Sequence, residues 1–293
     1  MAHRAKWAVK TELEVFSKTA LLVSSEGVYV VGGLKKSGLV IVLDKALGGV
    51  VRSQKVEETP ICAVAEDKVY CHVSNKFYVF NRNLELLGVR RTEKRCLDLA
   101  FDGERIFCVE RGSITIFDRE LSRERLVRID GCNYAFFNRA TGQMWLSCGD
   151  RLLIYRGASR EAEVEIKPTS RLVSFDEEGY GYLVGYVDGI LGTYKVSPDG
   201  RIEERFRAVP LFACGGYFYR PDVGPSSHFD KFVVYDSKLF KVGIVDLPVR
   251  LMPDREETYR AACDGPMLYI AAMDRTGRGR VVALGPVEED SSL

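Results

Sequence analysis

Residues 96–129 read CLDLAFDGERIFCVERGSITIFDRELSRERLVRI, and this stretch decides the fold. It contains four short runs rich in β-branched and aromatic residues, separated by links made largely of Asp, Gly, Glu, Arg and Ser. Such runs between turn-forming residues are typical of β-strands, and links this short are typical of hairpins. The stretch therefore predicts four consecutive antiparallel strands.

The same pattern recurs along the whole chain. The third run is the easiest to align, and its copies LVIVLD, FYVFN, ITIFD, LLIYR, GTYKVS and FVVYD start about every 37 to 41 residues. An Asp, Asn or Ser after this run can accept hydrogen bonds from its own backbone and so begin a turn. The first run of each unit starts at Ala20, Ile61, Cys96, Tyr134, Arg171, Leu211 and Tyr259. Seven repeats of one unit are therefore predicted.

The last repeat lacks a fourth run, whereas the run WAVKTELEVF at 7–16 precedes the first repeat and has no other partner. We expect this run to supply the missing strand. About forty residues per four-stranded unit is the size of a β-propeller blade. The chain therefore resembles a seven-bladed, all-β propeller of the broad WD-like and quinoprotein-like superfamily, closed by its N-terminal strand. The recurrent motifs of WD and kelch repeats are missing, so no specific family is identified, and a pair of β-sandwiches is the competing fold.

The repeats divide one domain, 1–293, into seven expected blades. Their approximate limits are 20–60, 61–95, 96–133, 134–170, 171–210, 211–252 and 253–290, with the closing strand at 7–16. The net charge of +1 gives no overall sign of a nucleic-acid or membrane partner. The chain has no apolar run of the roughly 18 residues that a spanning helix needs, and its start lacks the apolar core of a secretion signal. We therefore expect a cytoplasmic protein. A total of about seven Asn and Gln residues indicates a thermophilic source.

Eight cysteines are present, and none of them belongs to a C-x-x-C pair or to a zinc-finger spacing. Seven lie in apolar runs, where free cysteine behaves as a small buried hydrophobe, so we expect reduced thiols. Disulfides remain an alternative because hyperthermophiles keep them inside the cell. Cys62 and Cys71, which would face each other across a tight hairpin, are the first pair to test.

A propeller has two faces, and the predicted links carry opposite charge on them. One face, here called the basic face, holds the links between blades and between second and third strands, with an excess of about nine basic residues. The acidic face holds the other links and has a similar acidic excess. The candidate partner-binding residues on the basic face are Lys35, Lys36, Arg90, Arg91, Lys94, Arg95, Arg220, Arg275, Arg278 and Arg280. Two long insertions, starting at Arg220 and Leu247, lie on the same face.

Arginine-rich loops on a rigid scaffold can bind carboxylates or phosphates through bidentate contacts. An internal ion-pair network is the alternative reading of these loops, because Glu93 and Asp274 lie among the basic residues. Aromatic residues that would stack on bases are not interleaved with the clusters, which favours an acidic protein over nucleic acid.

Candidate chemistry is sparse. Asp98 lies inside an innermost strand, where its expected neighbours around the channel are Leu22, Ala63, Phe136, Ser174, Ala213 and Ala261. Because this ring is apolar, we expect the Asp98 carboxylate to cap backbone amides rather than to bind a metal ion. Asp98 is nevertheless the one candidate residue for a site in the channel. His228, beside Asp230, is the one acid–base candidate, and a plain loop histidine is the simpler interpretation.

The sequence therefore predicts no catalytic residue, metal or cofactor. We expect a non-catalytic interaction scaffold that presents its basic face to an acidic protein partner, as a subunit of a larger assembly. The alternative is a small-molecule hydrolase or ligand-binding propeller that acts at the mouth of the central channel.

Overall fold

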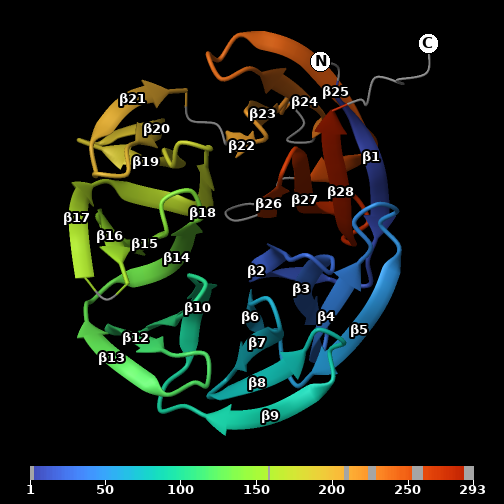
Figure 1. Cartoon of the computed structure of the whole chain (residues 1–293). Helices are drawn as coiled ribbons and strands as arrows, with labels where there is room; N and C mark the ends of the chain where they lie inside the picture. The colour runs from blue at the N-terminus through green and yellow to red at the C-terminus, as the bar shows by residue number, and fades with distance from the viewer. Residues whose placement is uncertain (1–2, 158, 208–210, 224–228, 253–259, 287–293) are drawn as a thin grey trace.

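The computed structural model describes residues 3–157, 159–207, 211–223, 229–252 and 260–286. Its strands form seven blades arranged in a ring (Figure 1). Five blades are separate four-stranded antiparallel sheets, and the last two are joined into one eight-stranded sheet where β25 pairs with β27. The prediction of a seven-bladed β-propeller is confirmed.

The first four blades follow the chain in order. Blade 1 is β2 (Val15–Val23), β3 (Val28–Leu34), β4 (Ser37–Leu43) and β5 (Val50–Val56). Blade 2 is β6 (Ile61–Val64), β7 (Lys68–Val73), β8 (Lys76–Asn81) and β9 (Leu86–Arg91). Blade 3 is β10 (Cys96–Phe101), β11 (Ile106–Glu110), β12 (Ser113–Phe117) and β13 (Arg123–Arg128). Blade 4 is β14 (Cys132–Asn138), β15 (Gln143–Cys148), β16 (Arg151–Arg156) and β17 (Ser159–Glu165).

The remaining blades complete the ring. Blade 5 is β18 (Lys167–Phe175), β19 (Gly181–Val187), β20 (Ile190–Val196) and β21 (Ile202–Phe206). Blade 6 is β22 (Phe212–Cys214), β23 (Tyr217–Pro221), β24 (Phe229–Tyr235) and β25 (Lys241–Met252). Blade 7 is β26 (Arg260–Asp264), β27 (Met267–Asp274) and β28 (Gly279–Pro286), and its fourth strand is β1 (His3–Lys10).

The closing strand β1 pairs antiparallel with β28, from His3 opposite Pro286 to Lys10 opposite Arg280. The expected position of this strand, 7–16, was wrong at both ends. Pairing begins at His3, and Val15 and Phe16 already belong to β2, where they lie opposite Gly33 and Gly32. The link between β1 and β2 is held by the backbone N–H of Thr11, which donates to the Gly279 carbonyl.

Burial follows the position of each strand in its blade. In blade 3, β11 and β12 are buried along their whole length, whereas β13 is mostly exposed. The core lies between neighbouring blades, because each cluster of buried side chains combines residues from two of them. One such cluster contains Tyr70 and Phe77 of blade 2 with Ile106 of blade 3. Continuous apolar runs therefore mark the inner strands, and polar residues mark the outermost strand.

The expected turns after the third strands are confirmed. The Oδ1 atoms of Asp44, Asn81, Asp118 and Asp236 accept backbone N–H groups two to four residues further on, and Ser197 Oγ accepts the N–H of Arg201. Each of these turns also contains a residue with positive φ. Short polar side chains that bind their own backbone therefore end the third strand in five blades.

Side-chain hydrogen bonds connect most pairs of neighbouring blades. Tyr70 Oη donates to the Arg119 carbonyl, Asn138 Nδ2 to the Gly179 carbonyl, and Ser17 Oγ to the Pro60 carbonyl. Arg260 Nε donates to the Ser17 carbonyl, which joins blade 7 to blade 1. Blades 3 and 4 are joined through Asp98, and blades 5 and 6 through Ser174.

All eight cysteines form disulfides: Cys62–Cys71, Cys96–Cys108, Cys132–Cys148 and Cys214–Cys263. The expectation of reduced thiols was wrong, while the pairing of Cys62 with Cys71 is confirmed. The three pairs within blades join first and second strands, where hairpin pairing brings buried cysteines close together. Burial in an apolar run was a correct prediction for most of them, but it did not indicate the oxidation state.

Candidate interaction surface and central cavity

The predicted basic residues lie where the strand directions place them. Lys35 and Lys36 form the link between β3 and β4, and Arg275 and Arg278 lie in the equivalent link between β27 and β28. Lys94 and Arg95 lie in the link from blade 2 to blade 3, directly after Arg90 and Arg91 at the end of β9. Because second strands end and first strands begin on the same side of a propeller, these links share one face.

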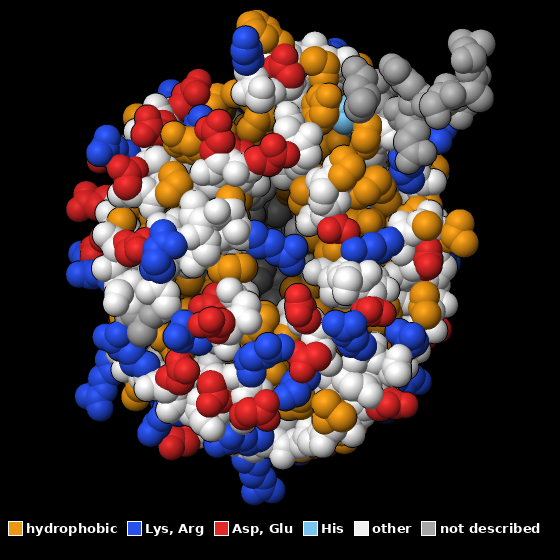
Figure 2. Space-filling view, in the orientation of Figure 1, with side chains coloured by type: hydrophobic (Ala, Val, Ile, Leu, Met, Phe, Trp, Pro, Cys, Tyr) orange, Lys and Arg blue, Asp and Glu red, His pale blue; other side chains and the backbone are white. Residues whose placement is uncertain are grey.

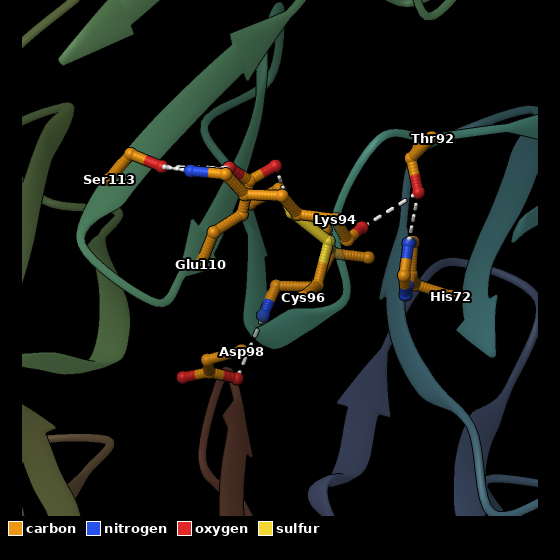
Figure 3. The surroundings of a disulfide bond; sticks show 9 residues. His72, Thr92, Lys94, Cys96, Asp98, Glu110 and Ser113 are labelled. Carbon is orange, nitrogen blue, oxygen red and sulfur yellow. Dashed lines mark hydrogen bonds and ion pairs between the residues drawn. A yellow bond between two sulfur atoms is a disulfide. The ribbon is translucent and has the colours of Figure 1, made fainter. Parts of the chain in front are cut away.

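Half of the ten residues bind other groups of the chain. The cationic groups of Lys94, Arg278 and Arg280 lie 3.9, 3.8 and 2.6 Å from carboxylates of Glu110, Glu14 and Asp274. Lys94 Nζ also donates to Ser113 Oγ (Figure 3). The guanidinium of Arg220 lies over the ring of Tyr235, and Arg90 donates to the Glu120 carbonyl. Internal ion pairs, the alternative interpretation of this face, therefore account for part of it.

The other five residues are Lys35, Lys36, Arg91, Arg95 and Arg275, and all five are exposed. Within the part of the chain that the structure describes, none of their side chains has a hydrogen bond or an ion pair. They belong to blades 7, 1 and 2 and to the link that follows blade 2, which are consecutive in the ring (Figure 1). We call these five residues the basic arc.

Two of the four exposed carboxylates between these residues already have ion pairs within the chain. Glu57 pairs with Lys76 and Glu93 with Arg123. Glu12 and Glu58 are exposed in the same links, and neither has an ion pair within the described residues; Glu58 accepts a hydrogen bond from Ser74. Five exposed cations facing two such carboxylates leave this part of the face positive. An acidic partner would meet exposed charge here without first breaking an internal pair.

His72 is buried beneath the same region and is only 2% exposed. Its Nε2 lies 3.0 Å from Thr92 Oγ1, and Thr92 in turn donates to the Lys94 carbonyl (Figure 3). Burial, with a smaller effect from the charge of Arg95, lowers the pKa of His72 to about 4. His72 is therefore a neutral structural residue at neutral pH and does not offer acid–base chemistry to a ligand.

Asp98 is fully buried and does not line the channel. Its Oδ1 accepts the N–H of Leu99 at 2.8 Å, and its Oδ2 accepts the N–H of Ala135 in blade 4 at 2.9 Å. Ser174 acts similarly, since its Oγ donates to the Leu211 carbonyl and accepts the N–H of Ala213. The carboxylate therefore caps backbone amides between two blades, which was the simpler of the two sequence interpretations.

A cavity of about 1090 Å³ occupies the centre of the ring. All six predicted ring neighbours of Asp98 line it, and they are Leu22, Ala63, Phe136, Ser174, Ala213 and Ala261. Its rim is formed by links between first and second strands, so it opens on the acidic face. Figure 2 shows a hollow at the centre of one face, with acidic and basic side chains mixed around it.

The rim contains charged groups that sequence reasoning did not identify. Arg139 of blade 4 reaches the carbonyl oxygen of Val23 in blade 1, on the other side of the ring. Lys45 pairs with Asp264 at 2.5 Å, and Lys195 lies over the ring of Tyr180. Arg139 meets Val23, and Lys45 meets Asp264, only when the ring closes, so no local motif marks these contacts. The lining combines apolar and aromatic side chains, such as Phe136 and Phe175, with many polar and charged ones, so it favours no single class of ligand.

The described residues contain no group of three His, Cys, Asp or Glu side chains placed to hold a metal ion. No helix of sufficient length and apolarity to cross a membrane occurs among them either. His228, the acid–base candidate, lies outside the described residues, as do parts of the two long insertions.

Comparison with known proteins supports the fold. No protein-family model matches the chain, and no curated protein matches it by sequence. Among solved structures, BamB from Moraxella catarrhalis is similar, with a TM-score of 0.57, 11% identity and 99% of both chains covered. Hsv2 from Kluyvelomyces marxianus is also similar, with a TM-score of 0.55 and 11% identity over 88% of this chain and 94% of that one. At this identity the likeness shows the propeller fold alone.

Proposed function

We propose that the protein is a non-catalytic interaction scaffold that binds an acidic protein partner through the basic arc, as a subunit of a larger assembly. The observation that carries the proposal is a set of five exposed cations on adjacent blades whose side chains have no ion pair or hydrogen bond within the described residues. Fold likeness does not select a function, because propellers host many unrelated activities. The proposal therefore rests on the chemistry of this surface.

The proposed partner is a protein before a nucleic acid. Nucleic-acid sites combine basic residues with aromatic rings that stack on bases. Tyr235, which lies under Arg220, is the nearest such arrangement among the ten candidate residues, and Arg220 lies outside the basic arc. Carboxylates on an acidic protein surface can bind to exposed guanidinium and ammonium groups without any aromatic side chain.

We place the protein in the cytoplasm of a thermophile. Disulfides are rare in reducing cytosol, with hyperthermophiles as the known exception. Four disulfides in a cytoplasmic protein therefore favour such a source, and the scarcity of Asn and Gln independently favours it too.

A charge-reversal experiment tests the proposal. The double variant Lys35→Glu/Lys36→Glu changes two residues of the basic arc. The control Lys238→Glu/Lys241→Glu makes the same charge change on the acidic face, at two exposed lysines, of which Lys238 lies in the link between β24 and β25 and Lys241 is the first residue of β25. Partners captured by the wild-type protein should be lost in the first variant and kept in the second. Capture should also weaken from low to moderate salt, because exposed charges are screened over about 10 Å at 0.1 M salt. Equal capture by both variants would overturn the assignment of the surface.

The alternative function, ligand binding at the cavity, is favoured by the cavity itself. Its volume of about 1090 Å³ is sufficient for a drug-sized molecule, and aromatic side chains such as Phe136 and Phe175 line it. Trp145 packs edge-on against Phe175 with ring centroids 5.0 Å apart. A ligand in the cavity should therefore change the fluorescence of Trp145, and a screen with this readout distinguishes the two functions.

A further inference from the structure

The four disulfides fall into two classes. Cys62 lies directly opposite Cys71, and Cys132 opposite Cys148, in strands that are already paired by hydrogen bonds. Cys96 and Cys108 also belong to paired strands, β10 and β11. These three bonds connect segments that the hairpins hold together without them.

The fourth disulfide joins two different blades. Cys214 lies in β22, the innermost strand of blade 6, and Cys263 lies in β26, the innermost strand of blade 7. These strands are not hydrogen-bonded to each other in the sheet order. The two residues are 49 positions apart, against 9, 12 and 16 for the other pairs. This bond is therefore the one disulfide that joins two blades among the described residues.

Blades 6 and 7 are joined by one kind of contact near the basic face and by another near the acidic face. Near the basic face β25 pairs with β27, with Leu251 opposite Asp274 and Met252 opposite Met273. Near the acidic face the disulfide is the connection, next to the links after β22 and β26. Side chains of both blades also share one buried cluster, which includes Phe212 and Leu268.

The fourth disulfide is also the accessible one. Both of its cysteines line the central cavity, and Cys263 is partly exposed. The six cysteines of the other pairs are at most 6% exposed, and none of them lines that cavity. The adjoining links contain Gly215, Gly216 and Gly265, which have no side chains to cover the sulfur atoms.

We propose that Cys214–Cys263 is a thiol–disulfide exchange site that reacts with low-molecular-weight thiols entering the cavity. A thiolate attacks Sγ of Cys263, the more exposed of the two cysteines. A mixed disulfide forms on Cys263, the bond between the two cysteines breaks, and Cys214 leaves as a thiolate that takes up a proton. A second thiolate attacks the mixed disulfide, which releases the oxidised small disulfide and leaves Cys263 reduced. The two small thiols are thereby oxidised and the protein disulfide is reduced.

Exchange at this site removes the connection between blades 6 and 7 at the acidic face and leaves the β25–β27 pairing in place. The shared core keeps the blades packed, so the reduced protein stays folded. The gap between β22 and β26 at the rim becomes free to widen. The concentration of small thiols in the surroundings would therefore control the width of the cavity mouth.

The test uses the native wild-type protein incubated with increasing concentrations of glutathione or 2-mercaptoethanol. Free thiols are trapped by alkylation and identified by peptide mass spectrometry. Cys214 and Cys263 should become alkylated at thiol concentrations about tenfold lower than any other cysteine, and the mixed disulfide should be found on Cys263. Simultaneous reduction of all four bonds, or earlier reduction of another bond, would overturn the proposal.

Two single variants provide an independent test. Cys214→Ser leaves Cys263 as a partly exposed thiol, which should form a mixed disulfide with oxidised glutathione within minutes to hours. The matched variant Cys71→Ser leaves Cys62 buried, and this thiol should stay unmodified under the same conditions. Modification of Cys62 as fast as Cys263 would contradict the assigned accessibility. If either variant fails to fold, the wild-type trapping experiment still decides the question.

Discussion

The indole Nε1 of Trp7 donates a 2.9 Å hydrogen bond to the carbonyl oxygen of Lys45. Trp7 lies on the closing strand β1, and Lys45 lies in the link between β4 and β5 of blade 1. In the same link, Gly48 has a φ of +72°, and a Cβ atom built on it would lie 2.6 Å from the Trp7 ring. The N-terminal strand therefore closes blade 7 through its pairing with β28 and is also attached to blade 1.

The first prediction concerns Gly48. Gly48→Ala places a side chain in the left-handed region and forces it against the Trp7 ring, so we expect a loss of at least about 2 kcal/mol in the free energy of unfolding. Gly49→Ala is the matched control, because no atom lies within 4 Å of its Cβ position. Denaturant unfolding followed by fluorescence measures both. Equal stability of the two variants would show that the Trp7 contact does not fix the closing strand.

The second prediction concerns the carboxylate between blades 3 and 4. Asp98→Ala leaves the buried N–H groups of Leu99 and Ala135 without the acceptors they have now, and we expect a loss of about 2 to 4 kcal/mol. Ser174→Ala removes a neutral hydroxyl with the same role and should lose about 1 to 2 kcal/mol. Thermal and denaturant unfolding measure the difference. A carboxylate that instead served a ligand would leave the stability of the Asp98 variant nearly unchanged.

The third prediction compares two turns of the same type. Leu121 and Leu239 have φ values of 63° and 61°, and each donates its N–H to the Asp that begins the turn. Leu121 is 3% exposed, whereas Leu239 is only partly buried. Glycine relieves the backbone strain at both positions but removes packing mainly at Leu121. We expect Leu121→Gly to lose about 2 to 4 kcal/mol and Leu239→Gly to change stability by less than about 1 kcal/mol, measured by urea unfolding.

Local patterns predicted the fold well because each blade is built from sequence-adjacent strands. Apolar runs, hairpin links and the Asx turns at residues such as Asp118 each depend on a few neighbouring residues, so they can be recognised from the sequence. The predicted ring of Leu22, Ala63 and their equivalents around the channel follows from the same alignment. The closing strand was found for a different reason: it was the one β-rich run without a local partner.

Features that depend on contacts between blades were not predictable. Arg139 reaches Val23 across the ring, and Cys214 bonds to Cys263 in the next blade. Neither residue has a distinctive local sequence, since the position of one blade relative to another decides these contacts. The sequence also does not indicate which basic residues form internal ion pairs. Lys94 and Arg95 are neighbours in the chain, yet only Lys94 binds a buried carboxylate, that of Glu110.

The last prediction concerns the pH dependence of stability. Burial lowers the pKa of His72 to about 4 in the folded protein, and its Nδ1 has no hydrogen-bond partner within the described residues. Unfolding exposes the ring, where its pKa is about 6.5, so the unfolded chain binds more protons between these two values. Neutral His72 therefore contributes at most about 3 kcal/mol to the free energy of unfolding. This contribution is fully present above pH 6.5 and is lost as the pH falls toward 4.

His72→Gln removes this titration while its side chain can still hydrogen-bond to Thr92. Between pH 7 and pH 4.5 the wild-type protein should lose about 2 to 3 kcal/mol more stability than the variant. Comparing the two proteins removes the contribution of the titratable groups that both contain. The measurement is the free energy of unfolding from urea titrations at several pH values. Parallel pH profiles for the two proteins would mean that folding does not lower the pKa of His72, and hence that water reaches the ring in the folded protein.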